Sequence, residues 1–222
     1  MSTPEERLTI DVPDKGLVSA AYLRPAKPVA SLAVFHGAGA GMDHPFMSGF
    51  ARAIAEEGVA TLRCNFPYME AGKRSPDRQP VAVATVVAAF GEAVSRAGRS
   101  EPVWVGGKSF GGRMASVAVA EGLPAAGLVF LGYPLHPPGK PERVRDEHLG
   151  GIEVPMLFLQ GTKDPFANPT VLEPVLAKLP TATHVAIEGG GHSLERSRTE
   201  DPRDVAGALA PLVASFIREE RA

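Results

Sequence analysis

The sequence carries a serine between glycines in a setting that suits a reactive hydroxyl. The pattern G-x-S-x-G spans Gly107–Gly111, with Ser109 at its centre. The preceding apolar run Val103–Val105 predicts a buried strand, and the following run Arg113–Ala120 predicts a helix. Where a strand turns sharply into a helix at a serine, the backbone is strained, the hydroxyl is exposed, and small residues are needed on both sides. The pattern therefore predicts a nucleophilic serine.

Two further residues complete a set that can activate such a serine. Asp164 follows one apolar run, and His192 follows another after three glycines. A serine hydroxyl needs a base with a pKa near neutrality, and a carboxylate can orient that base. Both residues have simpler explanations, because Asp before Pro often begins a turn and a histidine after glycines can lie in one. Glu188, inside a predicted strand, is a weaker candidate for the acid. The order Ser109, Asp164, His192 predicts acyl-transfer chemistry.

Acyl transfer also requires backbone N–H groups that stabilise an oxyanion. One donor is expected from Phe110, because it begins the helix after the serine. The second is expected from the glycine-rich loop His36–Gly41, where Ala38 is the favoured donor and Gly39 replaces it if the loop is shifted. His36 is expected to hold this loop rather than to act as a base.

The same glycines permit a second interpretation. Gly107, Lys108 and Ser109 resemble the end of a phosphate-binding loop, G-x-x-x-x-G-K-[ST]. That loop requires a glycine at position 102, where the sequence has Pro102, and the intervening residues suit a strand. The sequence therefore excludes this nucleotide-binding motif.

Short apolar runs alternate with helical stretches along the whole chain. The predicted strands are Leu8–Val12, Leu17–Leu23, Ser31–His36, Val59–Cys64, Pro102–Gly106, Gly127–Gly132, Pro155–Gln160 and His184–Glu188. The predicted helices are Pro45–Glu57, Val81–Ala97, Phe110–Glu121, Glu142–Leu149, Pro169–Lys178 and Arg203–Glu219. This alternation after an opening antiparallel hairpin predicts an α/β fold, a mostly parallel twisted sheet of about eight strands with helices on both faces. Functional groups in such sheets gather at the carboxyl ends of the strands.

The spacing of these elements predicts one domain over residues 1–222. Only Tyr133–Glu153 separates the sixth and seventh strands, which leaves room for one short helix and no cap domain. The site is therefore expected to be shallow and open unless the loop Asn65–Gln79 folds over it.

Composition narrows the possible partners and location. Apolar residues make up 44% and charged residues 22% of the 222 residues, and the net charge is −2, which favours neither nucleic acid nor an anionic membrane as partner. The single cysteine, Cys64, excludes an intramolecular disulfide and is expected to end a buried strand. The polar start of the chain is unlike a signal peptide, so a cytoplasmic location is expected. No His/Cys cluster has metal-ligand spacing, so no metal or organic cofactor is expected.

Several longer strings resemble the α/β-hydrolase family, and more narrowly small dienelactone-hydrolase-like proteins. The match is closest to the bacterial hydrolase-like group related to testis-expressed and chromatin-complex α/β-hydrolase-like proteins. It rests on His36–Pro45, Asn65–Glu70, Gly106–Ser109, Leu131–Lys140 and Gln160–Phe166. The dienelactone hydrolases use a cysteine nucleophile where this chain has Ser109.

The resemblance implies a serine hydrolase, similar to a carboxylesterase or thioesterase, that acts on a small acyl substrate through an acyl-enzyme. The catalytic residues would be Ser109, Asp164 and His192. The alternative is a non-catalytic binding or scaffold protein with the same fold. The resemblance supplies no substrate, because fold alone does not define one.

Basic residues lie on several loops at the predicted strand ends. Lys108 is inside the serine motif, His136 and Lys140 follow the sixth strand, and Tyr68 could supply one further hydrogen bond. The other basic residues are Lys73, Arg74, Arg78 and Lys163. One interpretation is that these loops are solvated and partly neutralised by nearby carboxylates; the other is that they bind an anionic group of the substrate.

Overall fold

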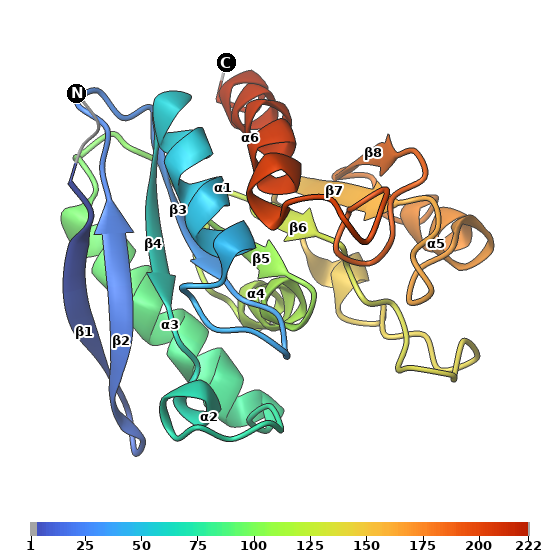
Figure 1. Cartoon of the computed structure of the whole chain (residues 1–222), viewed down its shortest axis with the longest axis horizontal. Helices are drawn as coiled ribbons and strands as arrows, with labels where there is room; N and C mark the ends of the chain where they lie inside the picture. The colour runs from blue at the N-terminus through green and yellow to red at the C-terminus, as the bar shows by residue number, and fades with distance from the viewer. Residues whose placement is uncertain (1–3, 222) are drawn as a thin grey trace.

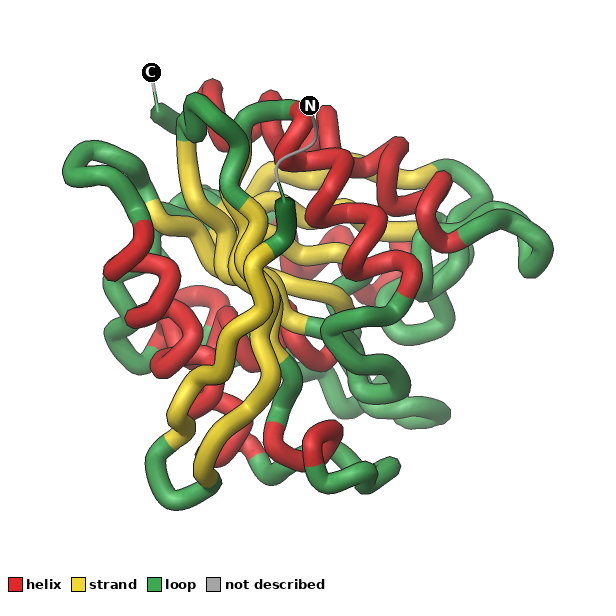
Figure 2. Tube along the Cα trace, turned by 60° about the vertical axis from the view of Figure 1, so that its left-hand side comes forward, coloured by secondary structure: helices red, strands yellow, loops and turns green. Residues whose placement is uncertain are grey.

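Eight strands form one twisted sheet in the order β1-β2-β4-β3-β5-β6-β7-β8 (Figure 1; Figure 2). The computed structural model describes residues 4–221. The strands are β1 (Glu6–Val12), β2 (Gly16–Leu23), β3 (Ala30–Phe35), β4 (Val59–Cys64), β5 (Val103–Lys108), β6 (Leu128–Leu131), β7 (Met156–Gly161) and β8 (Ala182–Ile187). The β1–β2 and β2–β4 pairs are antiparallel, and the other neighbouring pairs are parallel. The mostly parallel sheet with an opening hairpin is confirmed.

Helices cover both faces of this sheet. They are α1 (Pro45–Glu56), α2 (Pro67–Glu70), α3 (Gln79–Arg96), α4 (Phe110–Ala120), α5 (Pro169–Leu176) and α6 (Pro202–Glu219). Helices α1 and α6 pack together in front of the sheet in the view of Figure 1, whereas α3 lies behind it. Helices α4 and α5 share the apolar core of α3.

Proline and short polar side chains set where several helices begin. Proline occupies one of the first two positions of α1, α3, α5 and α6, where its missing N–H has no intrahelical acceptor to lose. Asp201 accepts a hydrogen bond from the Arg203 N–H at 2.8 Å and so caps α6. Asn168 caps α5 in the same way through the N–H of Val171.

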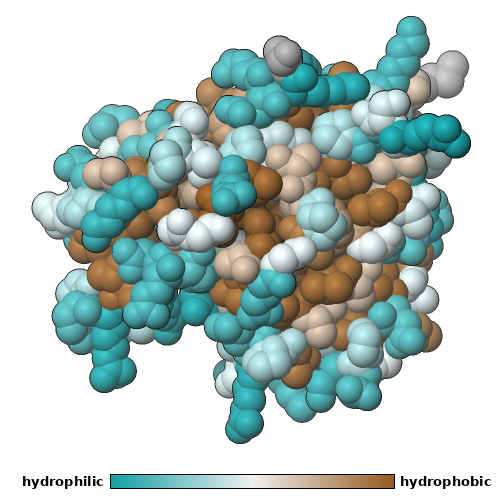
Figure 3. Space-filling model, turned by 180° about the vertical axis from the view of Figure 1, so that it is seen from behind, coloured by the Kyte–Doolittle hydropathy of each residue, from teal (hydrophilic) through white to brown (hydrophobic). Residues whose placement is uncertain are grey.

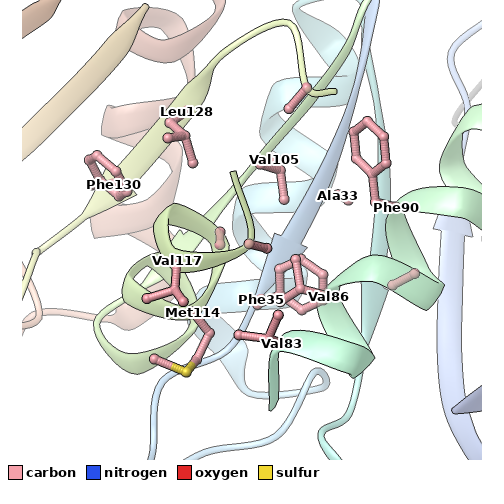
Figure 4. Close-up of a cluster of buried hydrophobic side chains, with 14 of the residues drawn as sticks. Ala33, Phe35, Val83, Val86, Phe90, Val105, Met114, Val117, Leu128 and Phe130 are labelled. Atoms are coloured by element: carbon pink, nitrogen blue, oxygen red, sulfur yellow. The ribbon is translucent and has the colours of Figure 1, made fainter. Parts of the chain in front are cut away.

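The strands contribute side chains to two apolar cores, one on each face of the sheet, because successive side chains point to opposite faces. In β3, Leu32 and Val34 face α1 and α6, whereas Ala33 and Phe35 face α3 and α4. Figure 4 shows Phe35 among side chains of the second core, including Val86 of α3 and Met114 of α4. Burial of each such side chain contributes about 1.5–3 kcal/mol, so both layers of helices hold the sheet.

The predicted helix Glu142–Leu149 is wrong. The segment between β6 and β7 consists of turns and one 3₁₀ turn, η1 (Leu149–Gly151). Prolines at 137, 138 and 141 have no N–H to donate and Gly139 has φ +67°, so the first half of this connection is not helical. The prediction that this connection is too short for a cap domain is confirmed, and no second domain covers this edge of the sheet.

On the face seen from behind in Figure 3, apolar residues gather over the middle and polar residues surround them. The large exposed apolar side chains of the described residues lie on β2, α3 and α6. They are Leu17, Val87, Val94 and Leu212. Between residues 4 and 221, no helix has both the length and the apolar character needed to cross a bilayer.

The turn from β5 into α4 brings three backbone segments closer than any side chain would allow. A β-carbon on Gly107 would lie 2.3 Å from the carbonyl oxygen of Phe35, and one on Gly111 would lie 2.5 Å from the same atom. On the other side of β5, a β-carbon on Gly106 would lie 2.1 Å from the carbonyl oxygen of Val129. The glycines of the serine motif are therefore required by packing against β3 and β6.

We expect Gly111→Ala to lower the free energy of unfolding by several kcal/mol, because the obstructing atoms belong to backbone and cannot move aside. The matched control is Gly91→Ala, on the exposed side of α3, where an added β-carbon meets nothing within 4 Å. That control should stabilise the helix by about 0.5–1 kcal/mol. Urea denaturation of both variants checks this, and equal effects in the two would contradict it.

Candidate active site

Ser109 lies at the point where β5 ends and α4 begins. Its backbone has φ 49° and ψ −115°, a conformation that L-residues rarely adopt and that stores on the order of 1–3 kcal/mol. The strain is held by packing on both sides, with the Ser109 N–H donating to the Leu131 carbonyl at 3.3 Å. The carbonyl of Ser109 accepts the first hydrogen bond of α4, from the N–H of Arg113 at 3.0 Å.

The structure brings the three sequence-predicted residues into one chain of hydrogen bonds. The Nε2 atom of His192 lies 2.7 Å from the Oγ of Ser109. Its Nδ1 atom lies 2.8 Å from the Oδ2 of Asp164. The Asp164 side chain is fully buried, whereas that of His192 is 21% exposed. A carboxylate at Nδ1 favours the tautomer with the proton there, which leaves the Nε2 lone pair free to accept the serine proton.

Asp164 is held by two donors besides the histidine. The backbone N–H of Phe166 donates to Oδ1 at 2.8 Å, and the Nε2 of Gln160 donates to Oδ2. The side-chain oxygen of Gln160 in turn accepts the N–H of Tyr133 at 2.8 Å. Gln160, buried in β7, therefore ties the carboxylate to the end of β6. Sequence reasoning missed this residue because it looks like the polar end of an apolar strand.

The loop that carries His192 is placed by close backbone contacts. Gly132, at the end of β6, has φ +76°, and a β-carbon there would lie 2.6 Å from the carbonyl oxygen of His192. A β-carbon on Gly161 would lie 2.3 Å from the carbonyl oxygen of Gly190. The ring of Phe166 packs edge-on against the His192 ring, with centroids 4.5 Å apart. These contacts fix the imidazole in front of Ser109.

The predicted oxyanion donors lie beside the serine. The segment Gly37–Ala40 and Phe110 line the same cavity as Ser109, and a β-carbon on Gly37 would be 3.6 Å from the Ser109 Cβ. The N–H groups of Ala38 and Phe110 donate to no acceptor within residues 4–221. Gly39 is more exposed than Ala38. Two free N–H groups next to the nucleophile can stabilise a developing oxyanion.

Two buried side chains hold the loop after β3. His36 places Nδ1 2.8 Å from the Gly37 carbonyl, and its Nε2 accepts the N–H of Phe66 at 3.1 Å. Burial lowers the pKa of His36 to about 4, so the ring stays neutral in this structural position. The hydroxyl of Tyr68 donates to the Ala38 carbonyl at 2.9 Å.

This contact corrects the prediction that Tyr68 binds substrate. The side chain is 1% exposed and does not line the cavity, because its hydroxyl is used by the loop that contains Ala38. Burial raises the pKa of Tyr68 to about 12. Tyr68 therefore supports the loop rather than the ligand.

Ser109 opens into a cavity of about 510 Å³. Its walls come from the loops after β3, β5, β6, β7 and β8, in accord with the strand-end rule. The loop Asn65–Gln79 contributes no residue to the lining, so it does not fold over the site. With no cap domain above it, the cavity is reached directly from the surface.

Lys108 lines the cavity as predicted, but its ammonium is buried. Its Nζ atom lies 4.8 Å from the centroid of the Phe46 ring and has no hydrogen-bond partner within the described part of the chain. Burial lowers the pKa of Lys108 to about 8, whereas the charges of Glu195 and Asp164 act in the opposite direction. The same side chain also lines a neighbouring cavity of about 310 Å³.

The other predicted substrate contacts divide into two groups. His136 lines the cavity, with Nδ1 2.9 Å from the Pro137 carbonyl and a buried Nε2 that has no partner among residues 4–221. Lys140 is exposed and lies outside the lining, which corrects the prediction for this residue. The remaining basic residues of the predicted rim are likewise exposed and absent from the cavity wall; they are Lys73, Arg74, Arg78 and Lys163.

A second serine–histidine pair lies under α4. The Oγ of Ser116 is 2.8 Å from the Nε2 of His148 and also donates to the Arg113 carbonyl. Ser116 is fully buried, and no carboxylate hydrogen-bonds to His148 in the described chain. Burial lowers the pKa of His148 to about 4. This pair is a buried polar contact that fastens the β6–β7 connection to α4.

Comparison with known families and structures places the fold. A family model described as an alpha/beta hydrolase domain matches residues 28–217. The chain belongs to the alpha/beta-hydrolase family. Among solved structures, this alpha/beta hydrolase is similar to a serine hydrolase without a lid from Xanthomonas campestris, at 22% identity and a TM-score of 0.75, with 97% of this chain and 96% of the other covered.

Two further structures give the same comparison. A dienelactone hydrolase from Anabaena variabilis is 18% identical with a TM-score of 0.77, and 99% of each chain is covered. A serine hydrolase homologue from Coxiella burnetii is 18% identical with a TM-score of 0.70, with 97% of this chain and 98% of the other covered. At these identities the similarity establishes the shared fold, and the chemistry must be argued from the residues.

We expect Gln160→Met to slow the reaction of Ser109 with a fluorophosphonate about ten- to a hundredfold. The substitution keeps the volume but leaves the Tyr133 N–H and one side of Asp164 unpaired, which also costs about 1–3 kcal/mol of stability. Reaction rates and urea denaturation measure the two effects. Leu159→Met, the neighbouring buried position on the opposite face of β7, is the control, and an equal loss of Ser109 reactivity there would remove the assigned role of Gln160.

We expect stability to fall as the pH is lowered from about 6.5 to about 4. The native rings of His36 and His148 stay neutral down to a pKa of about 4, whereas in the unfolded chain they protonate near 6.5. Between these values the unfolded chain binds more protons, so at pH 5 the loss of stability is on the order of 2 kcal/mol for the buried His36 and smaller for the partly exposed His148. Denaturation of wild type and His36→Gln/His148→Gln at pH 7 and pH 5 tests this. The double variant should show the smaller difference, and an undiminished one would refute the assignment.

Proposed function

We propose that this alpha/beta hydrolase is a serine hydrolase that cleaves a small ester or thioester through an acyl-enzyme. The observation that carries the proposal is the unbroken series from Ser109 Oγ to His192 at 2.7 Å and from His192 to Asp164 at 2.8 Å. Ser109 opens into a cavity that is also lined by Ala38 and Phe110, whose backbone N–H groups have no acceptor among residues 4–221. Nucleophile, base and oxyanion donors therefore converge on one point.

The proposed reaction has two halves. Ser109 Oγ attacks the acyl carbon while its proton passes to His192 Nε2, and Asp164 stabilises the imidazolium that forms. The N–H groups of Ala38 and Phe110 receive the oxyanion. The leaving alcohol or thiol takes the proton from His192, and a water molecule then repeats the sequence to release the acid.

The alternative is a non-catalytic binding protein with the same fold. A binding protein has no need of a hydrogen bond between serine and histidine, so a histidine turned away from Ser109 would favour this alternative. The 2.7 Å contact and the strained backbone of Ser109 argue for catalysis instead. Strain of this kind persists where it is part of a mechanism.

A fluorophosphonate probe should label the native protein and fail to label Ser109→Ala. Asp164→Asn should lower kcat/KM for a 4-nitrophenyl ester about 10⁴-fold, because the histidine loses the acceptor that fixes its tautomer. The matched control is Ser116→Ala, which removes the serine of the buried second pair and should leave labelling intact. A folded wild type that resists the probe, or labelling that depends on Ser116, would end the proposal.

A further inference from the structure

The charged residues in the wall of the active-site cavity are all basic. Its charged lining residues are Lys108, Arg113 and Arg145, and no aspartate or glutamate lines it. Asp164 is fully buried behind His192 and does not reach this surface. The chain as a whole has a net charge of −2, so the excess of positive charge in the cavity is local.

Arg113 is held in helix α4 with part of its guanidinium buried. It lies in the first turn of α4, four residues after Ser109, which corresponds to about 6 Å of helix rise. Its Nε is buried without a partner in the described chain, and a terminal nitrogen is 3.5 Å from the side-chain oxygen of Gln79. Burial lowers the pKa of Arg113, as does the charge of Arg145. A guanidinium with an unsatisfied Nε donor therefore lies in the wall of the cavity into which Ser109 opens.

Arg145 reaches the cavity from the β6–β7 connection. Its backbone is fixed, because its N–H donates to the Leu135 carbonyl at 2.7 Å and its carbonyl accepts the Tyr133 hydroxyl. Neither Arg113 nor Arg145 forms an ion pair within residues 4–221. Both side chains line the same cavity, and the positive charge of Arg145 lowers the pKa of Arg113, as expected of like charges that repel.

Nearby carboxylates do not relieve this repulsion. Glu121 and Glu147 line a separate cavity on the other side of Arg113, and neither comes within 4.0 Å of a guanidinium nitrogen of Arg113 or Arg145. His136 cannot replace an anion, because its Nδ1 is engaged by the Pro137 carbonyl and its free Nε2 offers a lone pair when the ring is neutral. No carboxylate between residues 4 and 221 pairs with either guanidinium, so both can pair with an anionic ligand.

We propose that Arg113 and Arg145 form a carboxylate-binding subsite, and that the substrate is an ester or thioester with a carboxylate a few bonds from the scissile carbonyl. The inference rests on the proposed hydrolase function. A carboxylate fits the fork of a guanidinium in a bidentate manner and would satisfy the buried Nε of Arg113. Arg113 follows Ser109 by about one helical turn, and both line the same cavity as Arg145. We therefore expect only a few bonds between the carboxylate and the scissile carbonyl of the substrate.

The test compares two esters that differ in charge alone, the 4-nitrophenyl half-ester of glutaric acid and the same ester with the free carboxylate amidated. At low ionic strength, and after subtraction of spontaneous hydrolysis, wild type should prefer the carboxylate ester at least tenfold in kcat/KM. Arg113→Gln and Arg145→Gln should each reduce this ratio about tenfold. Free glutarate should inhibit wild type competitively, and it should inhibit both variants less.

The controls separate this inference from the proposed function. Arg143→Gln changes an exposed arginine on the same connection that does not line the cavity, and it should keep the wild-type ratio. Labelling of Ser109 is measured first. If Ser109 is labelled and the amide ester is cleaved equally well or better, the subsite is refuted while the hydrolase remains; if Ser109 is not labelled, the function itself fails. Arg145 is exposed, so its variant decides the matter if Arg113→Gln unfolds.

Discussion

The structure depends on the close backbone approach between the β5–α4 turn and β3. Glycine at 107 and 111 lets the turn rest directly on the Phe35 carbonyl, and no other residue fits there. That contact forces Ser109 into its strained conformation and points its hydroxyl out of the sheet. It also brings the loop after β3 against the serine, so one packing constraint positions both the nucleophile and its oxyanion donors.

Buried polar residues behind the site hold its loops in place. His36 links the loop after β3 to the loop after β4, and Gln160 links the end of β6 to the acid after β7. Neither residue touches the cavity. Each satisfies backbone groups that would otherwise be buried without partners, which makes the geometry of the site part of the stability of the fold.

The sequence was sufficient for the sheet, most helices and the three residues that meet at the site, because these features depend on local patterns. Strand periodicity, the glycines around Ser109 and the order of Asp164 and His192 are all visible along the chain.

Arg113 and Arg145 were missed, because α4 and the β6–β7 connection meet at the cavity only in three dimensions. Tyr68 and Lys140 were misassigned for the same reason, since position near a strand end does not reveal whether a side chain turns inward or outward. The helix expected over Glu142–Leu149 did not form because tertiary contacts fix the segment otherwise: the Arg145 N–H donates to the Leu135 carbonyl, and Arg145 lines the cavity.

The short connection between β6 and β7 leaves no room for a cap domain, which affects how a substrate enters the site and how a product leaves it. In the described chain no cap domain covers the cavity, so substrate entry and product departure require no domain to open. The same openness admits water at every stage, and an acyl-enzyme here would meet solvent before it met a scarce acceptor. Under the proposed mechanism, such a cavity would select its substrate with fixed walls rather than by closing around it.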